Sequence, residues 1–83
     1  MTLTGEVLNA SGEERDVVGK DGTKRRTKVA HVLLQGKVDG GCEIYNIRSY
    51  DYEWELPKVG TKWTSPRVRR YECFDGLVAD VSV

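Results

Sequence analysis

Four turn signals divide this chain into short pieces and constrain its fold more than any other feature. Asp21-Gly22, Asp-Gly-Gly at residues 39–41 and Asp75-Gly76 are typical of tight hairpin turns, because Asp and Gly tolerate the positive φ angles that such turns require. Residues 57–60, Pro-Lys-Val-Gly, form a fourth turn signal. The chain is therefore expected to consist of extended segments joined by hairpins.

The segments between these turns have the composition of β-strands, being rich in Val, Ile, Thr, Leu, Tyr and Trp. In residues 77–83, every second side chain from Leu77 onward is apolar, which is the period of a half-buried strand. Residues 49–56 alternate in the same way, which favours a strand there over a helical turn. We predict the main strands over residues 2–9, 25–35, 42–49, 61–71 and 77–83.

With 83 residues, the chain is expected to form a single domain over residues 1–83. Five strands in a flat sheet would leave open edges and an apolar face that no predicted helix covers. Closure into a small barrel removes both problems. We predict an all-β fold, a small five-stranded OB-type barrel with protruding hairpins, and place the SH3-like barrel second.

No stretch approaches the roughly 18 apolar residues of a membrane span, and residues 1–10 lack the features of a secretory signal. We therefore expect a cytoplasmic protein, in the bacterial host cytoplasm if it is phage-encoded. Cys42 and Cys73 are predicted to be reduced there. They are also predicted to hold no metal, because His31 is the sole histidine and there is no CxxC pair. We expect no cofactor.

The small number of residues that could act as catalytic groups also argues against an enzyme. A nucleophile such as Ser65 or Cys73 would need His31 as its base, and nothing in the sequence places these residues together. No glycine motif that cradles a nucleotide phosphate is present. We predict a binding protein with no small-molecule substrate.

The 13 basic and 13 acidic side chains balance in number but are unevenly distributed. Residues 20–28 carry five basic groups and one Asp, and residues 58–70 carry five basic groups and no acid, while acids gather in residues 13–16 and 51–55. Aromatic side chains lie among the basic ones. This combination is typical of proteins that bind single-stranded nucleic acid, because cations neutralise phosphates and rings stack on bases.

We therefore predict a protein that binds single-stranded DNA without strong sequence preference, with RNA left open as a ligand. The predicted phosphate contacts are Lys20, Lys24, Arg25, Arg26, Lys28, Arg48, Lys62, Arg67, Arg69 and Arg70. The predicted stacking residues are Phe74, beside a turn, together with Tyr45, Tyr50 or Tyr71. The alternative is a small protein-interaction module or adaptor that uses the acidic aromatic stripe of residues 50–56, with Tyr50, Tyr52 and Trp54 as its contacts.

Three motifs resemble the filamentous-phage gene V type of single-stranded DNA-binding protein. They are Gly-Lys-Asp-Gly-Thr-Lys at residues 19–24, Lys-Val-Gly-Thr-Lys-Trp-Thr at 58–64 and Phe-Asp-Gly-Leu at 74–77. The resemblance implies an OB-fold homodimer that coats single-stranded phage DNA cooperatively during replication. It further implies a basic DNA-binding loop at residues 20–28 and a tip ring, Phe74, supplied across the dimer. Arg25 and Arg26 stand where members of that family often have an aromatic residue.

Overall fold

Six β-strands form the whole regular structure of the described residues. The computed structural model describes residues 1–36, 42–74 and 76–83, and for Phe74 the backbone only. The strands are β1 (Thr4–Val18), β2 (Lys24–Gln35), β3 (Ile44–Tyr50), β4 (Lys62–Thr64), β5 (Arg70–Phe74) and β6 (Val78–Ser82). The all-β prediction is confirmed, with six strands in place of five. The turn predicted at residues 39–41 and the Asp75 half of the last turn lie outside the described residues.

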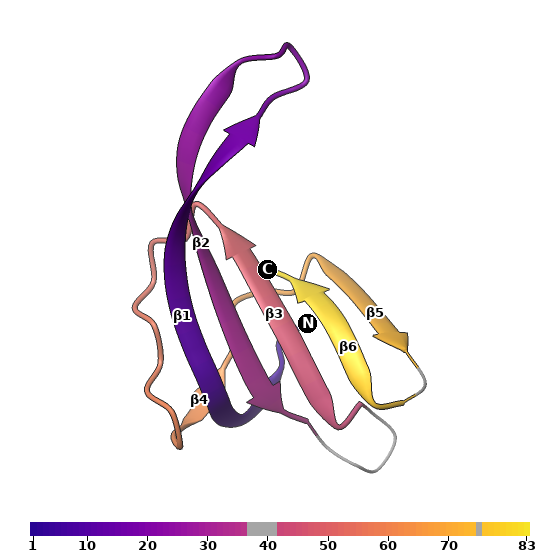
Figure 1. The fold of residues 1–83 in the computed structure, drawn as a ribbon. Coiled ribbons are helices and arrows are strands. Elements are labelled where there is room, and N and C mark those ends of the chain that lie inside the picture. The colour runs from indigo at the N-terminus through magenta and orange to yellow at the C-terminus, as the bar shows by residue number, and fades with distance from the viewer. Residues whose placement is uncertain (37–41, 75) are drawn as a thin grey trace.

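All six strands belong to one sheet, in the order β4-β1-β2-β3-β6-β5. Strands β1, β2 and β3 follow one another as an antiparallel meander, whereas β6 pairs with β3 in parallel and β5 returns antiparallel to β6. Figure 1 shows that this sheet is strongly curled. The connectivity and the curl are those of a partly open, OB-type barrel.

A short segment, residues 65–69, connects the two edge strands β4 and β5. Within it the Ser65 N–H donates to the Leu3 carbonyl at 2.7 Å, and the Leu3 N–H donates to Ser65 Oγ at 2.9 Å. The single strand expected over residues 61–71 is thus wrong. Pro66 has no N–H to continue a ladder, so the chain leaves β1 here and then pairs with β6.

The core lies on the concave face of the sheet. Its buried side chains come from β1, β2, β3 and β6 and from the residues just before β1 and β3: Leu3, Val7, Val32, Leu34, Cys42, Tyr45, Ile47, Ala79 and Val81. Residues 51–56 cross this face, because Asp51 has a positive φ of 53° that ends β3 and redirects the chain. Trp54 then packs against Tyr52 and Trp63, with ring centroids 5.1 and 5.5 Å apart. The strand expected over residues 49–56 ends at Tyr50, and no helical turn replaces it.

One hairpin projects beyond the rest of the sheet. Strands β1 and β2 pair from Glu6 and Gln35 out to Val18 and Lys24, but β3 pairs with β2 only from Val29 onward. Residues 14–28 therefore form a two-stranded ribbon, here called the arm, which twists away from the barrel (Figure 1). The arm makes the molecule long: its radius of gyration is 13.6 Å, against about 12 Å for a compact chain of this length.

A disulfide joins Cys42 to Cys73, with Cα atoms 6.5 Å apart, so the prediction of two reduced thiols is wrong. Cys73 lies opposite Ala79 on the core side of β5, and Cys42 is fully buried just before β3. Long-range strand pairing, which spacing in the sequence does not reveal, brings them together. Disulfides are rare in the cytoplasm, so this bond does not agree with the predicted compartment. No helix in the described ranges is long and apolar enough to cross a membrane.

Candidate nucleic-acid interface

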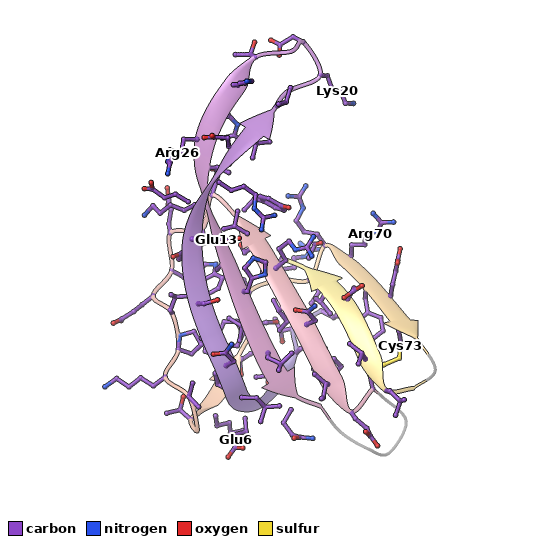
Figure 2. The ribbon with its side chains drawn as sticks, in the orientation of Figure 1. Glu6, Glu13, Lys20, Arg26, Arg70 and Cys73 are labelled. Carbon is purple, nitrogen blue, oxygen red and sulfur yellow. A yellow bond between two sulfur atoms is a disulfide. The ribbon has the colours of Figure 1, made fainter. Side chains whose placement is uncertain are left out.

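The first basic segment, residues 20–28, forms the tip and second strand of the arm. At the tip, Gly22 has a φ of 82°, and Asp21 Oδ1 accepts a hydrogen bond from the Thr23 N–H at 3.0 Å. That hydrogen bond lowers the pKa of Asp21. The predicted Asp21-Gly22 turn is confirmed. It leaves Lys20 and Lys24 exposed at the far end of the molecule, where Figure 2 shows Lys20.

Arg26 is neutralised by carboxylates of the neighbouring strand. Its Nε lies 2.9 Å from Glu14 Oε2, and its NH1 lies 3.6 Å from Asp16 Oδ1. The register produces these contacts, because Asp16 lies directly opposite Arg26 and Glu14 opposite Lys28. The hydrogen bond that Arg26 donates to Glu14 and the charge of Asp16 raise the pKa of Arg26. Two acids that the sequence places outside the basic segment therefore lie beside it.

Arg25 and Lys28 also have partners, both in the segment after β3. The Arg25 guanidinium donates two hydrogen bonds to the Asp51 carboxylate, at 2.9 and 3.3 Å, and Thr27 Oγ1 donates to the same carboxylate. Lys28 Nζ lies 5.7 Å from the centroid of the Tyr52 ring, within the range of a cation–π contact. Of the five basic side chains in this segment, Lys20 and Lys24 alone show no such partner among the described residues.

The second basic segment is divided between two places. Lys62 lies on β4 opposite Glu6, and Arg67 lies in the connection between β4 and β5. Arg69 directly precedes β5 and Arg70 is its first residue, and Arg48 of β3 lies beside them. The structure therefore brings Arg48, Arg69 and Arg70 together and leaves Lys62 and Arg67 apart from them.

Arg48 and Arg70 lie in one row across the convex face of the sheet. Register places His31 opposite Arg48, Arg48 beside Ser82, and Ser82 opposite Arg70. Residues paired in this way project to the same face of a sheet. The face is the one opposite the core, since Ile47 and Ser49 on either side of Arg48 are buried. Figure 2 shows Arg70 at the start of β5.

A shallow groove, here called the arginine groove, runs along this row. One part, of about 370 Å³, is lined by Arg48, Tyr50, Arg69, Arg70, Ser82 and Val83. The adjoining part, of about 220 Å³, contains the carboxylates of Glu72 and Asp80 as well as Arg48 and Arg70. Three guanidinium groups and a ring, with no carboxylate side chain among them, make the first part suited to a phosphate and a base.

The ion pairs support this distinction between the two parts. Arg70 donates to Glu72 Oε1 from Nε and NH2, at 3.1 and 2.8 Å. For Arg48 and Arg69, the described part of the chain holds no carboxylate within ion-pair distance. Tyr50 is 46% exposed at the same place. The groove therefore offers two arginines and a ring whose hydrogen-bonding and stacking capacity no described side chain uses.

The other predicted stacking residues are placed differently. Tyr45 is 7% exposed and belongs to the core, so its ring presents no face to a base, which removes it from the site. Tyr71 lies on the core side of β5 and packs edge-on against Tyr45, with centroids 6.2 Å apart, although one surface of it is exposed. The backbone of Phe74 lies opposite Val78 at the end of β5, and its ring lies outside the described part of the structure.

The aromatic stripe of residues 50–56 does not form one surface. Tyr50 projects into the arginine groove, whereas Tyr52 and Trp54 lie over the core side beyond Asp51. A Cβ at Gly12 would lie 2.3 Å from Tyr52 Oη, so glycine at this position lets the Tyr52 ring approach β1. The alternation that predicts a single acidic aromatic face is broken by the positive φ of Asp51.

Three polar residues of this face were not predicted from the sequence. Ser82 lines the groove, His31 lies opposite Arg48 with Nε2 3.4 Å from Glu13 Oε1, and Asp51 holds Arg25. No local signal marks them, because their places depend on the register of strands far apart in the sequence. In the described ranges, no cluster of His, Cys, Asp or Glu could hold a metal ion. The chain matches no protein-family model, no curated protein and no solved structure.

Proposed function

We propose that this protein binds single-stranded DNA, with little sequence preference, through the arginine groove on the convex face of β3, β6 and β5. The observation that carries the proposal is the grouping of Arg48, Arg69 and Arg70 around the exposed Tyr50 ring. OB-type barrels bind oligonucleotides on the face of their second and third strands, and the row that contains the groove begins on β2, where His31 lies opposite Arg48 of β3. The chemistry needed is a cationic surface for phosphates beside a ring for bases.

The side chains of the groove have different roles in the proposed binding. Arginine presents a planar fork of N–H donors that matches two phosphate oxygens. The Tyr50 ring stacks on any base, because every base has a π face. Ser82 adds a hydroxyl between Arg48 and Arg70. None of these groups reads a base edge, so the proposed binding tolerates different sequences.

The arm extends the proposed path of the strand. Lys20 and Lys24 lie at its tip and add positive charge far from the groove. They attract the phosphate backbone over a distance set by salt, about 10 Å at 0.1 M. Arg26 contributes less to this attraction, because its charge is offset by Glu14 and Asp16.

We also propose that two copies of the chain act together and that the protein serves the replication of phage or plasmid DNA. This part of the proposal rests on the resemblance to the gene V type of protein. Joining two grooves would raise the affinity for a strand long enough to reach both. Sedimentation equilibrium with and without oligo-dT measures the number of copies.

Fluorescence anisotropy of a labelled oligo-dT in low salt tests the binding. Arg48→Ala should weaken it about tenfold, since loss of one charge-assisted contact costs about 1.4 kcal/mol. Arg67→Ala is the matched control, because it removes the same charge from an exposed arginine that does not line the groove. Equal effects of the two substitutions, or no binding by the wild-type protein, would refute the proposal. RNA and duplex DNA as competitors define the preferred ligand.

A further inference from the structure

The base of the arm holds a second group of anion-binding donors. The Arg25 guanidinium donates at 2.9 and 3.3 Å, and the Thr27 hydroxyl also donates, to a single carboxylate, that of Asp51. A two-pronged guanidinium contact with a neighbouring hydroxyl is equally suited to the oxygens of a phosphodiester. Here the occupant is a side chain of the protein itself.

These donors lie on the same face as the arginine groove. Arg25, Thr27, Val29 and His31 are alternate residues of β2, so they project to one side of the sheet. His31 lies opposite Arg48, and Val29 lies opposite Tyr50. From Thr27 to His31 the chain advances about 13 Å at the usual rise of a strand. A strand of a few nucleotides, the length that one OB barrel accommodates, covers this distance.

Asp51 occupies the site without being buried in it. Its side chain is 53% exposed and that of Arg25 is 60% exposed. Ion pairs so open to water are weak, so a competing anion displaces the carboxylate at little cost. The backbone of Asp51 is held separately, since its N–H donates to the Lys28 carbonyl at 2.8 Å. The carboxylate is therefore free to leave while the chain stays in place.

We propose that Arg25 and Thr27 form a phosphate subsite of the bound DNA strand, and that Asp51 holds this subsite in the free protein until a phosphodiester replaces it. The inference rests on the proposed function and deepens it. On this proposal Asp51 lowers the affinity for DNA, and its role is not limited to stabilising the position of the arm. The acidic segment after β3 then acts as an internal competitor of the DNA backbone.

Asp51→Asn tests the proposal with labelled oligo-dT over a range of salt concentrations. Asn tolerates a positive φ, so the backbone can persist. The expected result is two- to fivefold tighter binding, the range that release of an exposed ion pair provides. Glu53→Gln is the matched control: it removes the same charge two residues away, from an exposed side chain with no contact to Arg25 among the described residues. It should change affinity less than Asp51→Asn does.

An Arg25→Ala background completes the experiment. The gain from Asp51→Asn should disappear there, because the donor that the carboxylate competes for is absent. Weaker binding by Asp51→Asn, or a change equal to that of Glu53→Gln, would overturn the proposal. Asp51→Gly, which suits the backbone and lacks the carboxylate, provides a second variant, and loss of the fold in both would assign Asp51 a purely structural role. If the wild-type protein binds no oligo-dT, the proposed function itself fails.

Discussion

The arm and the arginine groove are both rich in arginine, but they differ in what surrounds the charges. In the arm, Arg25 and Arg26 each lie within 2.9 Å of a carboxylate oxygen. In the groove, Arg48 and Arg69 have no such partner in the part of the chain that the structure describes. The arm therefore has more basic residues close together in the sequence than the groove has, but a smaller fraction of its arginines is free of a carboxylate partner.

Strand register produces this difference. Acidic residues 13–16 and basic residues 24–28 lie on the two strands of one ribbon, so antiparallel pairing places them opposite each other. Arg48 and Arg70 belong to strands separated by β6, whose residue in that row is the uncharged Ser82. A count of charges along a sequence predicts a basic surface only where the facing strand carries no acid.

The two regions also differ in how they are held. The groove lies on strands that are backed by the core and tied by the disulfide, whereas the arm is a ribbon of two strands held to the barrel by exposed contacts. Rigid placement of donors reduces the entropy cost of binding. The groove is thus expected to give most of the binding energy and the arm to adapt to the strand.

The largest effects are expected from substitutions on the two faces of β3, the strand that carries part of the groove: one face contributes to stability and the other to binding. Tyr45→Ala should lower the free energy of unfolding by about 3 to 5 kcal/mol, as for other buried aromatic residues. Tyr50→Ala should leave it nearly unchanged and weaken oligo-dT binding about tenfold, within the range of one lost base stack. Urea unfolding and anisotropy titrations measure both. If Tyr50→Ala lowered the free energy of unfolding and left oligo-dT binding unchanged, the Tyr50 ring would stabilise the fold, as Tyr45 does, and would not bind a base.

The disulfide should contribute about 3 to 4 kcal/mol to stability, from the closure of a loop with a sequence separation of 31 residues. A double substitution, Cys42→Ala with Cys73→Ala, should lose that amount and loosen β5, and with it Arg70. The arm should be unaffected. Thiol titration of the unfolded protein, purified without reductant, should find no thiol, and two after reduction. Two thiols before reduction would contradict the bond.

Hydrogen exchange should separate the arm from the groove in the native state. Amides of residues 14–28 are expected to exchange well before those of β3 and β6, because the arm has few buried apolar contacts and opens locally. Two-dimensional NMR after transfer to deuterated water gives the rates. Addition of oligo-dT should slow exchange in both regions. Equal protection of the arm and β3 in the free protein would show that the arm is as firmly held as the barrel.

A smaller effect is expected when low pH protonates Asp51, and it should be seen in the hydrogen exchange of the arm. Hydrogen bonds from Arg25 and Thr27 hold the pKa of Asp51 below its ordinary value of 3.8. A carboxyl with a lowered folded-state pKa stabilises the fold above its unfolded pKa and loses that contribution as the pH falls through the folded one. Exchange of the arm should thus be constant from pH 7 to 5, after allowance for intrinsic rates, and rise below about pH 4. Asp51→Asn should reduce this rise to the part that comes from Asp21, whose pKa is also lowered, and a rise of undiminished size would assign it to another group.

The sequence allowed the local features to be predicted and concealed the long-range ones. The Asp21-Gly22 turn follows from two residues, and the all-β class follows from the alternation and the turns together. By contrast, the Cys42–Cys73 bond and the Arg48–Ser82–Arg70 row require the parallel pairing of β3 with β6, which no local pattern marks. The stripe of residues 50–56 misled because one backbone angle, at Asp51, sends Tyr50 and Tyr52 to different faces.

The salt dependence of oligo-dT binding tests most directly whether available arginines, and not basic sequence density, determine binding. The logarithm of the binding constant should fall against the logarithm of salt by about 0.7 for each neutralised phosphate on a single strand. Replacing Arg48 and Arg69 by Ala should reduce the slope by about two such contacts, or about 1.4. Replacing Arg25 and Arg26 by Ala should reduce the slope by about one contact, or about 0.7, because the wild-type Arg26 is already paired with Glu14 and Asp16. A larger reduction from the arm pair than from the groove pair would contradict the account.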